Sequence, residues 1–153
     1  MKERIGRETE WQRAYAFDDI SLVPSAVTVD PRDVDVSTEV GGLRLDIPLL
    51  AAAMDGVEDV GFAVALSELG GLAVLNGEGL GSRYENPAEI VRRIADAPKE
   101  GVVEVLREAY RQPFRAEFLA EKIRSVKAQG AKLAVSATPK SCRQVRQIAE
   151  ELS

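Results

Sequence analysis

Few side chains in this sequence could carry out chemistry by themselves. The 153-residue chain contains no histidine and a single cysteine, Cys142. A zinc site, a Ser/His or Cys/His catalytic arrangement and an intrachain disulfide are therefore excluded. Chemistry confined to these residues needs carboxylates, lysines or a bound cofactor.

Two adjacent carboxylates stand at Asp18 and Asp19, within the segment YAFDDISLV that places Tyr15 and Phe17 at strand spacing. Paired carboxylates can serve as acid and base or bind a metal ion. The alternative is that they accept hydrogen bonds from backbone N–H groups at the mouth of a loop. We favour the second interpretation, because the neighbouring sequence offers no further ligands, and we predict no metal site.

The other polar candidates each follow an apolar run that predicts a buried strand. Asp55 follows residues 47–54, Asn76 follows residues 72–75, and Ser136 and Thr138 lie at the end of the run that starts at Leu133. Ligands of α/β folds bind at the carboxyl ends of parallel strands. The two hydroxyls could contact a ligand there or cap the next helix.

Asn76 also opens a glycine-rich segment, NGEGLGS, at residues 76–82. The segment does not fit the dinucleotide-binding pattern G-x-G-x-x-G, because Ser82 stands at the last glycine position and the next helix begins only near Asn86. A flexible loop that shapes a substrate pocket and a plain connection both remain open.

Cys142 belongs to the last predicted helix, residues 141–152, on one stripe with Val145, Ala149 and Leu152. A reactive cysteine needs exposure and a positively charged neighbour, which this stripe does not offer. The pattern therefore predicts a thiol in the core and no nucleophile.

A βαβ unit at residues 47–76 positions the first two candidates. The run from Ile47 to Met54 has no alternation, which is typical of a parallel strand buried on both faces. Asp59 is placed to cap a helix that carries Phe62, Leu66 and Leu69 on one stripe. A crossover helix of this length makes the two strands parallel.

Three more helices are predicted before the third strand. The first begins at Asn86, with Pro87 and Glu89 completing a capping box. The second ends before Pro113, and the third ends at Gly130. The third strand covers residues 133–137.

The residues before the βαβ unit predict a lead-in and a hairpin. Residues 2–13 are mostly charged and polar, and we expect a loose segment. Alternating residues 33–40 and 43–45 flank Gly41 and Gly42, a strong hairpin signal. We expect this hairpin to lie over the starting ends of the strands.

Composition limits the partners. The chain is 45% hydrophobic and 29% charged, with a net charge of −5 and a pI near 4.9. These values are ordinary for a globular protein and give no basic footprint for nucleic acid or an anionic membrane. The sequence has no apolar run of transmembrane length and no signal peptide, so we expect a cytoplasmic protein.

The fold class predicted is α/β, a TIM (β/α)8 barrel of which only the N-terminal hairpin and the first three βα units are present. A complete barrel needs eight such units in typically ~250 residues. We assign residues 1–46 to the lead-in and hairpin, and residues 47–153 to the incomplete barrel as a single domain. The unpaired edge of so apolar a sheet is unfavourable, so we expect the first part of a longer protein.

Four segments occur in a familiar order: YAFDDISLVPS, VDVSTEV, IPLLAAAMDGV and ELGGLAVLN. This order resembles the opening of the IMP dehydrogenase and GMP reductase superfamily, where FDD-x-x-LVP and P-L-x-x-A-x-MD recur. Typical IMP dehydrogenases carry CBS modules between the second and third strands, whereas residues 77–132 have room only for helices. The chain therefore resembles the members without CBS modules, and RYENP and AVSATP are most similar to the IMP dehydrogenase-related branch.

This resemblance implies an oxidoreductase that binds a purine nucleotide, IMP or GMP, and NAD or NADP, and transfers hydride at purine carbon 2 through a cysteine adduct. It implies a homo-oligomer in the full-length protein. By the same resemblance, Ala52, Met54 and Asp55 contact the nucleotide, and the residues near the cofactor are Asn76, Ser136 and Thr138. Ala52 replaces the usual serine, and Asn76 replaces a frequent histidine. Cys142 does not match the catalytic cysteine, so no catalytic residue is assigned.

We therefore expect the N-terminal part of such an enzyme, inactive alone. The alternative is a stand-alone partial-barrel module that pairs its open edge with another subunit. A different phosphate-binding TIM barrel is a third possibility, which the ordered motifs weaken.

Overall fold

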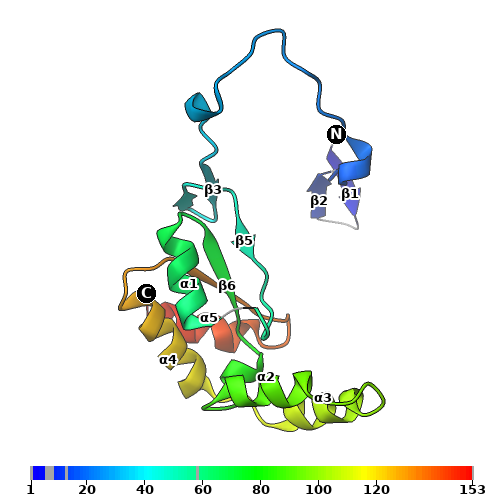
Figure 1. Ribbon diagram of the computed structural model, residues 1–153, viewed down its shortest axis with the longest axis vertical. Coiled ribbons are helices and arrows are strands. Elements are labelled where there is room, and N and C mark those ends of the chain that lie inside the picture. The colour runs from blue at the N-terminus through cyan, green and yellow to red at the C-terminus, as the bar shows by residue number, and fades with distance from the viewer. Residues whose placement is uncertain (1, 6–8, 13, 58, 153) are drawn as a thin grey trace. The chain divides into compact units, whose positions relative to one another are not determined.

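The computed structural model describes residues 2–5, 9–12, 14–57 and 59–152, and Figure 1 shows its secondary-structure elements. The chain divides into two compact units, residues 1–35 and residues 36–153. Each unit is described by itself below.

The first unit contains a small antiparallel hairpin, in which β1 (Lys2–Ile5) pairs with β2 (Thr9–Gln12). The prediction of a loose segment at residues 2–13 is wrong. This hairpin could not be predicted, because the many charged residues hide any alternation of apolar and polar positions.

The rest of the first unit forms two short 3-10 turns, η1 (Phe17–Asp19) and η2 (Pro31–Asp33). The strand spacing of Tyr15 and Phe17 therefore does not produce a strand. Asp19 instead accepts a hydrogen bond from the backbone N–H of Ala16, at 2.9 Å. This contact confirms the backbone-bonding interpretation for Asp19.

The second unit begins with the predicted hairpin, β3 (Thr38–Val40) paired antiparallel with β4 (Leu43–Leu45). Gly41 and Gly42 form the turn with φ values of 58° and 80°, a left-handed conformation that glycine adopts without strain. The first strand is shorter than predicted, since η2 occupies residues 31–33.

The hairpin lies at the amino-terminal ends of the parallel strands, as predicted. Leu45 is fully buried, and the N–H of Asp46 donates to the carbonyl of Gly70, two residues before β6. Lys132, directly before β7, donates its ammonium to the carbonyl of Arg44 at 2.6 Å.

The sheet of this unit has three parallel strands in the order β5 (Leu50–Ala51), β6 (Leu72–Asn76) and β7 (Leu133–Ser136). The first strand is shorter than predicted, because the N–H of Met54 turns back to the carbonyl of Ala52. The predicted burial on both faces is also wrong. Leu50 is 49% exposed, since β5 has one neighbouring strand.

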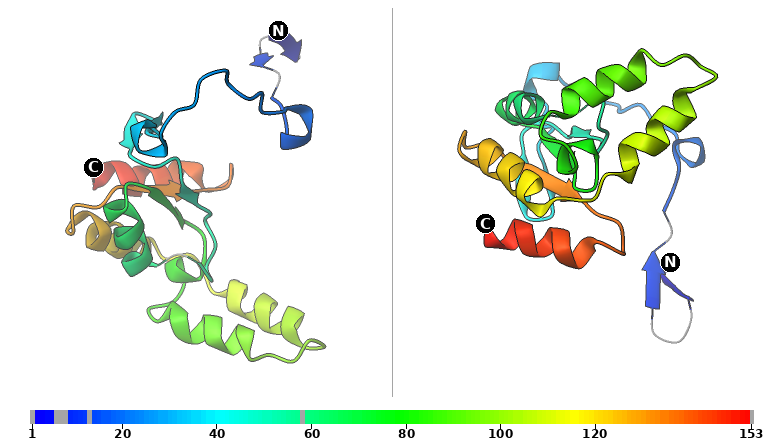
Figure 2. Two further views of the ribbon diagram at one scale, coloured as in Figure 1. Left: turned by 45° about the horizontal axis from the view of Figure 1, so that its top comes forward. Right: turned by 90° about the horizontal axis from the view of Figure 1, so that it is seen from below.

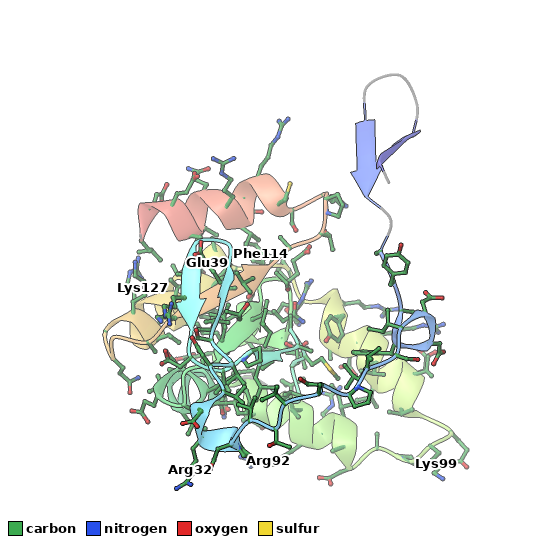
Figure 3. The ribbon with its side chains drawn as sticks, turned by 90° about the horizontal axis from the view of Figure 1, so that it is seen from above. Arg32, Glu39, Arg92, Lys99, Phe114 and Lys127 are labelled. Carbon is green, nitrogen blue, oxygen red and sulfur yellow. The ribbon has the colours of Figure 1, made fainter. Side chains whose placement is uncertain are left out.

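Three helices cover one face of this sheet: α1 (Val60–Glu68), α4 (Ala116–Lys127) and α5 (Cys142–Glu151), as Figure 2 shows. The core joins alternate residues of β6 to all three helices: Ala63, Ala73, Leu75, Leu119, Ile123, Val126, Val145 and Ile148. Figure 3 marks Phe114, which packs against this core just before α4 begins. The buried residues of α4 are Leu119, Ile123 and Val126.

Two further helices, α2 (Pro87–Ala95) and α3 (Val102–Arg111), form a helical hairpin between β6 and α4. Lys99 lies at its far end (Figure 3). Asn86 precedes α2 as predicted, but its side chain makes no capping hydrogen bond. The predicted capping box is therefore wrong, although the helix is present.

The helix stripes are partly different from those expected. Ala63 is the fully buried residue of α1, whereas Phe62 is 40% and Leu69 is 70% exposed.

Within the described residues, the outer edges of β5 and β7 pair with no strand, and the sheet does not close. None of the described helices is long and apolar enough to cross a membrane.

Candidate functional site

The carboxyl ends of the three parallel strands bring the predicted polar residues together. Asp55 accepts a hydrogen bond from the backbone N–H of Leu80 at 2.8 Å through Oδ1. Its Oδ2 accepts from Asn76 Nδ2 at 3.4 Å. The N–H of Gly77 donates to the carbonyl of Ser136 at 3.1 Å, so β7 also ends at this place.

The glycine-rich segment is a packed loop that ends in the short turn η3 (Leu80–Ser82), and its turn residues are buried. Gly79 is required for space, because a Cβ there would lie 1.9 Å from Asp55 Oδ1 and 2.7 Å from Asn76 Nδ2. The side-chain oxygen of Asn76 accepts from the N–H of Glu78 at 3.2 Å. The loop is thus built around Asp55 and Asn76.

Glu78 connects this loop to the end of β7. Its carboxylate accepts a hydrogen bond from the backbone N–H of Thr138 at 2.7 Å. This bond, and a second from the Ser141 hydroxyl, hold the pKa of Glu78 below its ordinary value. Sequence reasoning missed Glu78, although it is the only acid within residues 76–82.

Thr138 is exposed and lies at the start of α5. Its carbonyl accepts hydrogen bonds from the N–H groups of Ser141 and Cys142, at 3.1 and 2.9 Å. Its hydroxyl lies 3.2 Å from the Ser141 hydroxyl. The Thr138 backbone therefore forms the turn that precedes α5, its hydroxyl caps no N–H group of the helix, and Ser136 is half-buried at the strand end.

Tyr110, from α3, is the second site residue that sequence reasoning missed. Its hydroxyl donates to Asp55 Oδ2, and burial together with the Asp55 carboxylate raises the pKa of Tyr110 to about 12. The sequence places Tyr110 in the predicted helix that ends before Pro113, and nothing in it links this residue to Asp55. The carboxylate contact depends on how the chain folds back over 55 residues.

Arg83 contacts both the glycine-rich loop and the end of α3. Its guanidinium lies 5.7 Å from the centre of the Tyr110 ring, a cation–π distance. It also donates to the carbonyls of Glu78, Tyr110 and Gln112. The neighbouring Tyr84 donates its hydroxyl to the carbonyl of Ala109 at 3.0 Å.

Ala52 and Met54 lie outside this hydrogen-bonded network. Both are exposed, whereas Ala51 and Ala53, which alternate with them, are partly buried. Both residues belong to the turn that follows β5, in which the N–H of Met54 donates to the carbonyl of Ala52. The structure therefore leaves both side chains accessible to a ligand.

A cavity of about 530 Å³ adjoins Asp55 between the β5–α1 loop, η3 and α2. Its lining includes Gly81, Arg92 and Lys122, and Figure 3 marks Arg92 on α2. Its volume falls in the range of small-molecule sites. Asp55 is the one predicted site residue in its lining.

Cys142 is exposed, and its thiol donates to the carbonyl of Pro139 at 3.3 Å. The prediction of a core thiol is wrong, because Val145 and Ile148 form the buried face of α5 and Cys142 is the first residue of that helix. Across the described part of the chain, no group of three or more Cys, Asp or Glu residues could hold a metal ion.

Comparisons with known proteins agree over almost the whole chain. The IMP dehydrogenase / GMP reductase domain matches residues 14–152. An uncharacterized oxidoreductase of Mycolicibacterium smegmatis is 30% identical over 142 residues, which cover 90% of this chain and 38% of that protein. The inosine-5'-monophosphate dehydrogenase of Methanocaldococcus jannaschii is 52% identical over 67 residues, 44% of this chain and 14% of that enzyme.

A solved structure gives the same result for the fold. The IMP dehydrogenase/GMP reductase-like protein of Corynebacterium glutamicum matches with a TM-score of 0.81 and 30% identity, over 98% of this chain and 42% of that chain. The present chain thus spans about two fifths of the length of the relatives that it matches throughout. By its sequence and its fold, the chain belongs to the IMP dehydrogenase / GMP reductase family of oxidoreductases.

Proposed function

We propose that this chain is the amino-terminal portion of an NAD(P)-linked purine nucleotide oxidoreductase that acts at carbon 2 of IMP or GMP. In this proposal its three parallel strands are the first three of a TIM barrel. The observation that carries the proposal is the family match over residues 14–152. The gathering of Asp55, Asn76 and Ser136 at one edge of the sheet supports it, because barrel enzymes bind substrates at that edge.

The carboxyl end of β5 suits the nucleotide. Ala52 and Met54 are accessible there, and a flat purine ring can pack against such apolar side chains. Asp55 lies beside them, with its carboxylate already engaged by the loop and by Tyr110. We assign the nucleotide contacts to Ala52, Met54 and Asp55.

The residues at the next two strand ends suit a nicotinamide cofactor. Asn76, the last residue of β6, supplies an amide, and Ser136 and Thr138, at and just after the end of β7, supply hydroxyls. When bound, NAD(P) would supply the hydride acceptor or donor. In this chain the three side chains would bind and orient the carboxamide and ribose, and no residue is assigned a catalytic role.

The proposal is tested by a segment exchange in a known enzyme. The 67-residue segment of the M. jannaschii IMP dehydrogenase that matches this chain is replaced by this chain's own residues. We expect the chimera to retain IMP-dependent reduction of NAD. A chimera that melts like the parent enzyme but has no activity would contradict the proposal.

The 153 residues alone are expected to show no turnover. An assay of NAD(P)-dependent conversion of IMP or GMP by the isolated chain checks this expectation, with the parent M. jannaschii enzyme as positive control. Turnover by the isolated chain would show that the catalytic group lies within these residues.

One observation favours a second candidate function, an assembly module. Among the described residues no strand pairs with the outer edge of β7, and a groove of about 660 Å³ runs beside it, lined by residues such as Leu133, Val135, Val145 and Ala149. Such a groove could receive a strand from another subunit. Stable association with a second subunit, without nucleotide binding by either, would favour the module over the enzyme.

A further inference from the structure

The carboxylate of Asp55 is held by three donors from three parts of the chain. These are the backbone N–H of Leu80 in the glycine-rich loop, the amide of Asn76 at the end of β6, and the hydroxyl of Tyr110 on α3. An ionised carboxylate has about four acceptor positions. About one position is therefore left for a ligand.

Tyr110 differs from the other two donors, because it belongs to the helical hairpin and not to the strand ends. Arg83 fixes the hairpin to the loop at the carboxyl-terminal end of α3, through the carbonyls of Tyr110 and Gln112. The hydroxyl of Tyr110 is consequently brought to Asp55 by a braced segment. A donor held in this way restricts the rotation of the carboxylate.

We propose that Tyr110 is a positioning residue of the candidate site, because its hydroxyl fixes the orientation of the Asp55 carboxylate. In this orientation one carboxylate oxygen holds the glycine-rich loop. The remaining acceptor position faces a ribose hydroxyl of a bound nucleotide. The ligand part of this inference rests on the proposed function. The loop part does not.

The electrostatics fit this role. Because the pKa of Tyr110 is raised to about 12 by burial and by Asp55, its phenol stays protonated near neutral pH and remains a donor. Tyr110 therefore orients Asp55 without adding a negative charge beside it. Arg83, which lies over the ring, is the positive group that faces the pair.

The first test measures the loop in the full chain without ligand. Hydrogen exchange of the Leu80 amide is compared in Tyr110→Phe and in the matched control Tyr84→Phe, which removes a hydroxyl that joins the same loop to the same helix. We expect Tyr110→Phe to accelerate exchange at Leu80 by about fivefold or more, the equivalent of one lost hydrogen bond, and Tyr84→Phe by less than about twofold. Equal acceleration in the two variants would overturn the positioning role.

A spectroscopic measurement identifies the contact directly. The absorbance of tyrosinate is titrated in the wild type, in Tyr110→Phe and in Asp55→Asn. We expect Tyr110→Phe to remove the tyrosine whose pKa is raised, and Asp55→Asn to let Tyr110 ionise at a lower pH. An unchanged titration in Asp55→Asn would contradict the contact.

The second test measures the ligand. Dissociation constants for GMP and for 2′-deoxy-GMP and 3′-deoxy-GMP are determined for the wild type and both tyrosine variants. We expect Tyr110→Phe to lose several-fold in affinity for GMP and to bind GMP and one deoxy analogue equally, while Tyr84→Phe keeps the wild-type ratio. An unchanged ratio in Tyr110→Phe would overturn the ligand part. If the wild-type chain binds none of these nucleotides, the nucleotide site itself is refuted, and the Leu80 exchange still decides the positioning role.

Discussion

Gly79 lies tightly against the Asp55 carboxylate in the candidate site. The Cβ of an alanine at position 79 would lie 1.9 Å from Asp55 Oδ1, so the carboxylate and the loop would have to separate. We expect Gly79→Ala to lower the free energy of unfolding by about 1–3 kcal/mol. Thermal or urea denaturation measures this change, and Gly56→Ala, where a Cβ meets nothing within 4 Å, is the matched control with little effect. Similar losses in both variants would count against the tight contact.

Glu78 predicts a dependence of stability on pH. The backbone N–H of Thr138 and the Ser141 hydroxyl hold the pKa of Glu78 below its ordinary value of 4.5, so the unfolded chain binds the proton more readily than the folded chain. The stabilisation is therefore complete above pH 4.5 and is lost as the pH falls through the lowered pKa. We expect Glu78→Gln to flatten the stability–pH curve in that acid range. The exposed Glu121→Gln serves as control, and an unchanged curve in Glu78→Gln would argue against the Thr138 contact.

Sequence reasoning found those site residues that a strand places directly. Asp55 and Asn76 were predictable because each follows a buried run, and parallel strands end at one edge. Glu78 and Tyr110 were not, because their roles depend on contacts across 60 and 55 residues of the chain. Cys142 was misplaced because its position on a helix stripe does not reveal that it stands at the first residue of the helix.

At the scale of elements, α4 is the helix on which the core depends. Leu119 is fully buried there, whereas Leu106 on α3 is 37% exposed. We expect Leu119→Ala to lower the free energy of unfolding by about 2–5 kcal/mol, through lost burial and the cavity left behind. The same change at Leu106 should cost about 1 kcal/mol or less. Chemical denaturation of both variants measures the difference, and equal costs would mean that α3 belongs to the core.

The elements that were predicted well from the sequence are those with a regular spacing of apolar residues or a clear terminating residue such as glycine. The strand β6, the helices α1 and α4 and the glycine turn of the β3–β4 hairpin all lie where expected. The extent of β5 could not be predicted, because a backbone turn at Ala52 and Met54 ends it within an apolar run. The pairing of β1 with β2 could not be predicted, because the two strands show no alternation of apolar and polar residues.

At the scale of the molecule, the described sheet has two unpaired edges, at β5 and β7. Exposed strand edges favour association with other chains. We expect the isolated chain to associate as its concentration rises, and Leu50→Lys, which places a charge on the edge strand β5, to weaken that association. Sedimentation velocity over a range of concentrations measures it. Leu69→Lys, at an exposed position beside α1, is the control, and equal effects would show that the edge of β5 is not the contact.

Arg83 lies just before the α2–α3 helical hairpin, and its guanidinium donates to the carbonyls of Tyr110 and Gln112 at the end of that hairpin. These hydrogen bonds hold the two ends of residues 84–109 together beside the sheet. Because these two ends are held together, we expect a segment inserted between them to leave the neighbouring strands undisturbed, whether the segment is one pair of helices or an additional domain. A natural or engineered insertion at this position would enlarge the hairpin without changing the strands that hold it.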